Sequence, residues 1–149
     1  MARRKARQQA MQLLFQWDLR KAESLATSAD DTLNGYYGSL LIDEDTVGEP
    51  LKDPFAEELF RGVVDQNVEL DALIQRHAAH WRIERMPAVD RNILRIAAYE
   101  MLRTETPPPV AIDEALELAR KFAGEESVHF LNGVLDAVKR ELAEPSAKA

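Results

Sequence analysis

The sequence has no cysteine, only six scattered glycines and no long hydrophobic run. The lack of cysteine excludes disulfide bonds, cysteine-ligated zinc, iron–sulfur clusters and thiol nucleophiles. No apolar stretch approaches the roughly 20 residues that a helix needs to cross a bilayer. The basic N-terminus is not followed by the apolar core and cleavage site of a secretory signal. These absences predict a cytoplasmic protein that does not enter a membrane.

The residues that are present suit one globular domain. The chain has 149 residues, of which 46% are hydrophobic and 30% are charged. This length and apolar fraction allow a substantial core and argue against general disorder. We therefore expect a single domain over residues 1–149.

The charge is distributed unevenly along the chain. The formal net charge is −7, yet residues 1–7 contain no acid and carry four basic side chains, Arg3, Arg4, Lys5 and Arg7. Because this segment holds +4, the remaining 142 residues hold −11. An acidic body repels nucleic acid at long range, whereas a basic segment attracts phosphate locally. A nucleic-acid partner is thus expected to contact the N-terminus.

Hydrophobic spacing predicts helices throughout the chain, and we find no repeat and no useful strand alternation. Residues 4–21 place five apolar side chains on one helical face: Ala6, Ala10, Leu13, Leu14 and Trp17. Asp53-Pro54 is typical of a helix start. The helix from there would use Phe55, Leu59 and Val63, and a second would follow through Leu70, Leu73, Ile74 and His77.

The second half of the chain shows three more helical stretches. Residues 89–102 are apolar almost all round, which is typical of a helix at the centre of a bundle. Residues 110–123 follow three prolines and carry their apolar face on Ile112, Ala115, Leu116, Ala119, Phe122 and Ala123. Gly124 is placed where a C-terminal cap is expected. The last helix, about 126–142, would bury Val128, Leu131, Val134, Leu135, Val138 and Leu142.

Two segments look irregular. Residues 24–50 contain six acidic residues, no Lys or Arg, and the turn markers Asn34-Gly35, Gly38, Gly48 and Pro50. We expect a long acidic loop there, with at most a short docked turn. Residues 144–149 are expected to form a frayed tail.

The sequence carries no catalytic motif. The glycines do not build a phosphate-binding loop, and no nucleophile elbow occurs. His77, His80 and Glu84 have the spacing of metal ligands on one helix face, but Leu73, Ile74 and Trp81 share that face and favour packing over a metal. We expect no enzyme activity, no cofactor and no metal.

Two features are compatible with RNA binding. Arg4, Arg7, Met11 and Phe15 form a ridge beside the core stripe, where cations next to apolar side chains suit single-stranded RNA. A solvated N-terminus, with Met11 and Phe15 packed on a neighbour, explains the same spacing. Phe130 lies at the flank of the last helix, where it would stack on a base, meet a protein or be half-buried at the core edge.

Four stretches of the chain resemble the NusB family of bacterial transcription antitermination factors. They are RRKARQQAMQLLFQW at residues 3–17, VDRNILRIAAYE at 89–100, PVAIDEA at 109–115 and FLNGVLD at 130–136. They occur in the family's order and spacing, from residue 3 to about 20 and from about 54 to 139. Segment 22–53 departs from the family, being acidic and longer than usual.

The resemblance implies an all-α fold of about seven helices in two packed three-helix sets. It implies a non-enzymatic factor that binds the boxA element of nascent rRNA leader transcripts together with NusE, a small-subunit ribosomal protein. This complex would keep RNA polymerase resistant to termination. Family members occur as monomers and homodimers, and the sequence does not indicate which of these oligomeric states this chain adopts. Some rRNA cytosine methyltransferases carry a similar module, but they need a catalytic cysteine that is absent here.

The resemblance also implies residue roles. The RNA-binding residues would be Arg3, Arg4, Lys5, Arg7, Glu126 and Phe130. The NusE-facing residues would be Phe15 and Asp90. The rival hypothesis is a helical protein-binding adaptor without sequence-specific RNA recognition. Under the leading hypothesis, four basic contacts predict a log–log salt slope of roughly −3 on single-stranded RNA. Arg4→Ala with Arg7→Ala is expected to weaken RNA binding without unfolding, and Asp90→Lys to weaken NusE binding.

Overall fold

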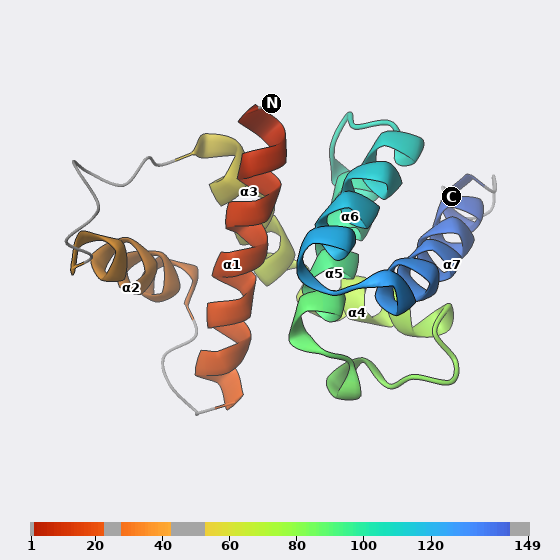
Figure 1. Ribbon diagram of the computed structural model, residues 1–149, viewed down its shortest axis with the longest axis horizontal. Coiled ribbons are helices and arrows are strands. Elements are labelled where there is room, and N and C mark those ends of the chain that lie inside the picture. The colour runs from red at the N-terminus through yellow and green to blue at the C-terminus, as the bar shows by residue number, and fades with distance from the viewer. Residues whose placement is uncertain (1, 23–27, 43–52, 144–149) are drawn as a thin grey trace. The chain divides into compact units, whose positions relative to one another are not determined.

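The computed structural model describes residues 2–22, 28–42 and 53–143, and every regular element among them is a helix (Figure 1). The chain divides into two compact units, Met1–Val64 and Asp65–Ala149. The first unit contains α1 (Ala2–Ala22), α2 (Ala29–Ile42) and α3 (Pro54–Asp65), which ends at the boundary. The second contains α4 (Asn67–Arg76), a 3₁₀ turn η1 (Ile83–Arg85), α5 (Ala88–Arg103), α6 (Pro108–Phe122) and α7 (Glu125–Ala143). The all-α prediction and the predicted number of helices are confirmed for these residues.

Helices α1 and α3 form as their sequences predict. The five residues of the predicted α1 stripe are all buried: Ala6, Ala10, Leu13, Leu14 and Trp17. Helix α3 begins at Pro54, and Oδ1 of Asp53 accepts hydrogen bonds from the backbone N–H groups of Phe55 at 2.9 Å and Ala56 at 3.3 Å. These bonds satisfy donors that a helix start leaves unpaired, so Asp53 is the predicted N-cap.

Helix α2 corrects the prediction of a loop over residues 24–50. Residues 29–42 of that segment are helical, whereas residues 24–27 and 43–50 lie outside the described residues. The hydroxyl of Ser28 accepts a hydrogen bond from the N–H of Asp31 at 3.1 Å and donates one to its carboxylate at 2.7 Å. This pairing caps the N-terminus of α2. The sequence prediction relied on the glycine turn markers and did not take this cap into account. Leu33 and Tyr36 are buried, and Tyr36 donates a hydrogen bond to Gln12 of α1.

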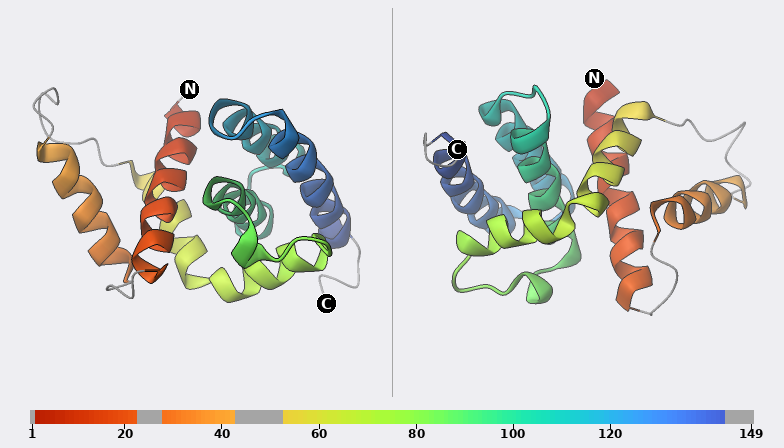
Figure 2. Two further views of the ribbon diagram at one scale, coloured as in Figure 1. Left: turned by 60° about the horizontal axis from the view of Figure 1, so that its bottom comes forward. Right: turned by 180° about the vertical axis from the view of Figure 1, so that it is seen from behind.

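Helix α5 forms the centre of the second unit, as its all-round apolar sequence predicts. It packs against α4, α6 and α7, which surround it in the left view of Figure 2. Every residue from 92 to 100 is buried. Arg95 lies in this core and donates to both oxygens of Asp71 at 2.7 and 2.8 Å, which compensates its buried charge.

Helices α6 and α7 agree with the sequence in position and differ in detail. Gly124 has a φ of +118° and ends α6, a left-handed conformation that favours glycine. The predicted α6 face was wrong at its C-terminal end, because Phe122 and Ala123 are exposed there and Leu118 is buried instead. In α7, five of the six predicted core residues are buried: Val128, Leu131, Val134, Leu135 and Val138.

The two compact units contain different numbers of α-helices in their described residues. The first unit has three α-helices in its described residues, but the second has four, because α4 packs on α5 and α7. The predicted frayed tail at 144–149 lies outside the described residues. No helix in the described ranges is both long enough and apolar enough to span a membrane.

Candidate functional site

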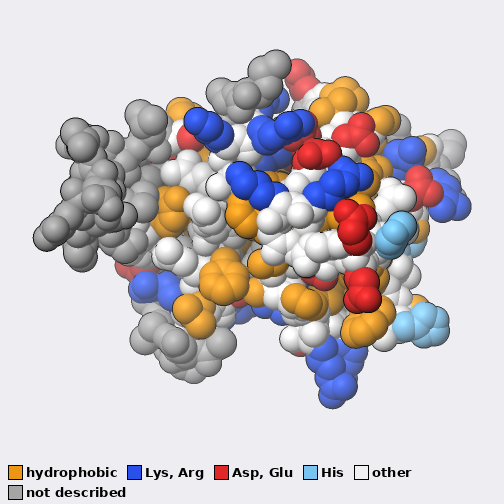
Figure 3. All heavy atoms as spheres, viewed as in Figure 1, with side chains coloured by type: hydrophobic (Ala, Val, Ile, Leu, Met, Phe, Trp, Pro, Cys, Tyr) orange, Lys and Arg blue, Asp and Glu red, His pale blue; other side chains and the backbone are white. Residues whose placement is uncertain are grey.

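The first candidate site is the basic end of α1. Arg3, Arg4 and Lys5 occupy the first turn of this helix and are exposed. The guanidinium of Arg3 lies 4.5 Å from the centre of the Phe55 ring. This cation–π contact leaves the charge of Arg3 at the surface while it orders the side chain. Figure 3 shows Lys and Arg side chains gathered over the N-terminal half of α1.

Arg7 differs from the other three basic residues because it is only 5% exposed. Its guanidinium lies 5.6 Å from the centre of the same Phe55 ring, so α3 covers it. A phosphate cannot reach a side chain buried in this way without a rearrangement. The structure therefore places Arg3, Arg4 and Lys5 at the surface and packs Arg7 between α1 and α3.

The predicted ridge of Arg4, Arg7, Met11 and Phe15 is not one continuous surface. Arg7 and Met11 are buried, whereas Phe15 is 46% exposed. Leu19 follows Phe15 by one helical turn and is also exposed. Hydrophobic side chains are visible over the C-terminal half of α1 in Figure 3. This exposed apolar pair suits protein contact, the role that was expected for Phe15.

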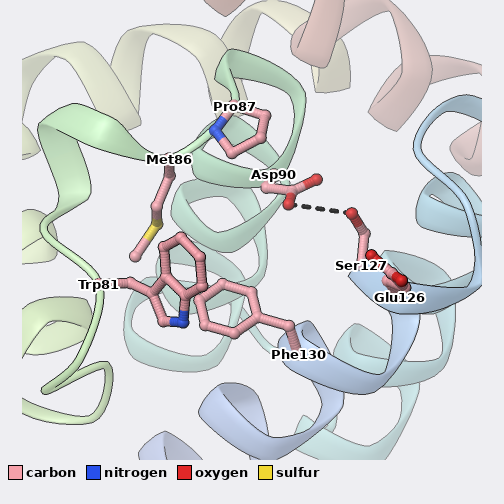
Figure 4. Close-up of a pocket in the computed structure, with 7 residues that line it drawn as sticks. All are labelled: Trp81, Met86, Pro87, Asp90, Glu126, Ser127 and Phe130. Atoms are coloured by element: carbon pink, nitrogen blue, oxygen red, sulfur yellow. Dashed lines mark hydrogen bonds between the residues drawn. The ribbon is translucent and has the colours of Figure 1, made fainter.

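The second candidate site is a pocket of about 280 Å³ in the second unit (Figure 4). It is lined by residues of three segments: the α4–α5 connection, the start of α5 and the first turns of α7. The lining residues are Trp81, Met86, Pro87, Asp90, Glu126, Ser127 and Phe130. Asp90, Glu126 and Phe130 were singled out from the sequence in two separate roles, and the structure brings all three together.

Asp90 is the buried polar group of this pocket. It is 5% exposed, and its Oδ2 accepts a hydrogen bond of 3.0 Å from the Ser127 hydroxyl. Its Oδ1 is buried and has no hydrogen-bond partner among the residues that the structure describes. Burial raises the pKa of Asp90 above its usual value, and the hydrogen bond from Ser127 opposes this shift.

Trp81 and Phe130 form the aromatic part of the pocket. Their ring centroids are 6.2 Å apart and their planes meet at 68°, an edge-to-face contact. Trp81 is 57% exposed and Phe130 is half-buried. The sequence placed Trp81 on the packing face of a helix, which was wrong because α4 ends at Arg76 and Trp81 lies in the following turn. Sequence reasoning did not identify Trp81 as a pocket residue. The signal that could have done so is a large aromatic side chain placed just after the end of a helix.

Gln75 holds the turn that carries Trp81. Its side-chain amide donates to the carbonyls of Ala78 at 3.0 Å and Trp81 at 2.9 Å. Its Oε1 accepts the N–H of Ile83 at 2.9 Å. All hydrogen-bonding groups of one amide side chain thus connect the end of α4 to residues 78–83. This arrangement fixes the backbone from which the indole extends.

The histidines do not assemble a metal site in the described parts of the chain. No group of three or more His, Cys, Asp or Glu side chains is found there with suitable geometry. Nε2 of His77 lies 3.0 Å from Oε1 of Glu141, which also pairs with Arg76. His80 is exposed in the turn. His77, His80 and Glu84 therefore lie in the connection after α4 and do not share a helix face.

Comparisons with known proteins agree with this fold. The sequence model of the NusB family matches residues 4–140. The transcription antitermination protein NusB of Solibacter usitatus (strain Ellin6076) is 59% identical over 146 residues, covering 98% of this chain and 94% of that protein. The protein of the same name from Koribacter versatilis (strain Ellin345) is 47% identical, covering 94% and 90%.

Two solved structures are similar over most of their length. The structure of T. maritima NusB has a TM-score of 0.73 and 32% identity, covering 98% of this chain and 96% of that one. The crystal structure of the antitermination factors NusB and NusE in complex with dsRNA has a chain with a TM-score of 0.72 and 26% identity, covering 93% and 96%. With the family match across residues 4–140, these similarities show that the chain belongs to the NusB family.

Proposed function

We propose that this chain is a non-enzymatic, cytoplasmic RNA-binding factor in transcription antitermination. It binds the boxA element of nascent rRNA leader transcripts together with the ribosomal protein NusE, and the complex keeps RNA polymerase resistant to termination. The family relationship and the similarity to a NusB chain solved with NusE and dsRNA support this proposal.

The exposed basic first turn of α1 is the observation that carries RNA binding. Arg3, Arg4 and Lys5 are surface cations in a chain whose net charge is −7. Phosphate neutralisation by such a cluster supplies affinity without sequence preference. Specificity for boxA then comes from contacts to unstacked bases and from NusE, which restricts how the RNA approaches.

The burial of Arg7 changes the expected salt dependence. Each phosphate contact on a single strand contributes about −0.7 to the log–log salt slope, so three surface cations give about −2. Four contacts would give about −3. The slope therefore measures how many of the four basic residues touch RNA.

The test is fluorescence anisotropy of a labelled boxA-like RNA against a scrambled RNA, with and without NusE, across a salt series. We expect a preference for boxA that increases with NusE. Arg3→Ala with Lys5→Ala is expected to weaken binding and flatten the slope. The matched control, Arg120→Ala with Arg140→Ala, removes the same charge from exposed positions of α6 and α7.

The outcome that contradicts the proposal is equal affinity for both RNAs in every condition. The chain would then be a helical protein-binding adaptor without sequence-specific RNA recognition, which is the alternative function. The exposed apolar pair Phe15 and Leu19 suits a protein partner, which the alternative shares with the proposed function. NusE binding without RNA selectivity would support it directly.

A further inference from the structure

The aromatic ring of Phe55 extends from the start of α3 to the basic end of α1. The guanidinium of Arg3 lies 4.5 Å from the ring centre, and that of Arg7 lies 5.6 Å from it. Helix α3 begins beside the N-terminal half of α1 (Figure 1). Because residues four apart share one face of a helix, both guanidiniums approach the ring from the same side of α1. One ring of α3 thus contacts two cations of α1.

The two contacts differ in what they leave accessible. Arg7 is 5% exposed and packs against the ring. Arg3 is exposed, and among the residues that the structure describes no carboxylate oxygen lies within 4 Å of its guanidinium nitrogens. An aromatic face attracts a cation without neutralising its charge. Arg3 therefore combines an ordered side chain with a charge and N–H donors that can still bind a phosphate.

The local sequence of α3 fixes the position of the ring. Asp53 caps the helix, and its Oδ1 accepts a hydrogen bond of 2.9 Å from the backbone N–H of Phe55. Pro54 has a restricted φ that suits the first helical position. The ring is half-buried, with Arg7 packed on it. The cap, the proline and the buried arginine together determine where Phe55 presents its face to Arg3.

We propose that Phe55 is a positioning residue for RNA, which holds the guanidinium of Arg3 in place to bind a backbone phosphate. This inference rests on the proposed function. An arginine side chain has many rotamers, and ordering it during binding reduces affinity. The ring removes part of that cost before the RNA arrives. Because every RNA has the same phosphates, this contribution is equal for boxA and for a scrambled RNA.

Lys5 provides an internal comparison in the same turn of α1. It is exposed like Arg3, but in the described ranges of the chain it contacts neither an aromatic ring nor a carboxylate. Its ammonium group therefore has to be ordered by the RNA itself. Loss of the Phe55 ring is expected to reduce what Arg3 contributes to RNA affinity and to leave the contribution of Lys5 unchanged.

The experiment is a double-mutant cycle on the full chain, with fluorescence anisotropy of single-stranded boxA-like and scrambled RNAs. Phe55→Leu removes the ring and is expected to weaken binding of both RNAs by about three- to tenfold. Adding Phe55→Leu to Arg3→Ala is expected to change affinity by less than about twofold, because the ring then has no side chain to position. Phe55→Tyr keeps the ring and is expected to bind within about twofold of the wild type.

The control cycle combines Phe55→Leu with Lys5→Ala, and the two losses are expected to multiply. A role of Phe55 in the fold alone would give the same result in both cycles, so the difference between the cycles identifies positioning. Circular dichroism and thermal unfolding establish that each variant retains its helices. Phe55→Met, whose flexible side chain adapts to irregular space, replaces the leucine variant if the helices are lost.

Three outcomes overturn the inference. The first is wild-type RNA affinity in Phe55→Leu. The second is independent losses from Arg3→Ala and Phe55→Leu, which would mean that the ring contacts RNA directly or supports the fold alone. The third is a loss in Phe55→Tyr as large as that in Phe55→Leu.

The scrambled RNA separates this inference from the proposed function. Equal affinity of the wild type for both RNAs, with coupling between Arg3 and Phe55, contradicts boxA recognition and supports the positioning role. A preference for boxA without coupling supports the proposed function and overturns the positioning role. If the wild-type chain binds neither RNA at low salt, both are overturned.

Discussion

The hydroxyl of Ser127 donates a hydrogen bond of 3.0 Å to Oδ2 of Asp90, while Oδ1 of the same carboxylate is buried and has no partner in the described parts of the chain. The bond connects the first turn of α7 to the first turn of α5 across the candidate pocket. One neutral donor compensates a buried carboxylate only in part.

Asp90→Asn is expected to stabilise the free protein at pH 7. Burial raises the folded-state pKa of Asp90 above its usual 3.8, so the charged form is less favourable in the folded protein than in the unfolded chain. This cost is present at pH values above the folded pKa and disappears below about 3.8, where both states are protonated. We expect Tm to rise by about 3 °C at pH 7, with the gain lost near pH 3.

Thermal unfolding followed by circular dichroism at both pH values measures this effect. Ser127→Ala is the control, because it removes the one hydrogen bond and is expected to lower Tm at pH 7. A lower Tm for Asp90→Asn at pH 7 would mean that the charge itself stabilises the fold. The asparagine variant is thus expected to be more stable and to bind NusE less tightly.

Arg7→Ala is expected to affect stability more than RNA contact, because its guanidinium is buried against the Phe55 ring. We expect a loss of about 1–2 kcal/mol in the free energy of unfolding. Lys5→Ala, in the same helix turn but exposed, is expected to change stability less than about 0.5 kcal/mol and to weaken RNA binding. Urea unfolding and RNA anisotropy on both variants distinguish the two roles. Equal stability of the two variants would contradict the packing role of Arg7.

Gln75→Leu is expected to release the turn that carries Trp81. The substitution removes two donors and one acceptor that hold residues 78–83. Because the N–H of the buried Ile83 loses its partner, the expected destabilisation is about 1–3 kcal/mol. The Trp81 indole signal should broaden or shift in an NMR spectrum. Gln75→Glu keeps an acceptor for Ile83 but sets a carboxylate oxygen against the carbonyls of Ala78 and Trp81, so it should not restore the turn. An unaltered Trp81 signal in Gln75→Leu would show that Gln75 does not position the indole.

Glu141→Gln is expected to reduce stability at neutral pH and not in acid. Arg76 donates to both oxygens of Glu141, and this pairing, assisted by His77, lowers the pKa of Glu141 below its usual 4.5. The stabilisation is present above the unfolded-state pKa and is lost as the pH falls through the lower folded-state value. We expect a loss of about 0.5–1 kcal/mol at pH 7, since the pair is partly exposed.

Denaturant unfolding at pH 7 and pH 3 tests the Glu141 prediction. Glu117→Gln is the matched control, because Glu117 pairs with Arg120 on the exposed surface of α6 and its loss should be barely measurable. A destabilisation by Glu141→Gln that is the same at both pH values would contradict an electrostatic origin. It would indicate that packing of the side chain against α4 is what matters.

The sequence by itself determined the all-α class, the central position of α5 and most helix boundaries. These features follow from local chemistry: apolar spacing selects the buried face, Asp53 supplies a cap and Gly124 adopts a positive φ. The loop prediction was wrong at α2 because Gly35 and Gly38 are turn formers in isolation. Burial of Leu33 and Tyr36 offsets that weak local preference, and the Ser28–Asp31 cap starts the helix.

Only the tertiary structure decided which candidate residues share a site. Asp90 and Phe130 are 40 positions apart, so no local spacing places them in one pocket, and Trp81 joined them because Gln75 fixes a turn beyond the end of α4. The same holds for Arg7, whose burial depends on Phe55 of another helix. Helix periodicity encodes which face is apolar, but the partner that covers a face, and hence which charges remain exposed, is set by long-range packing.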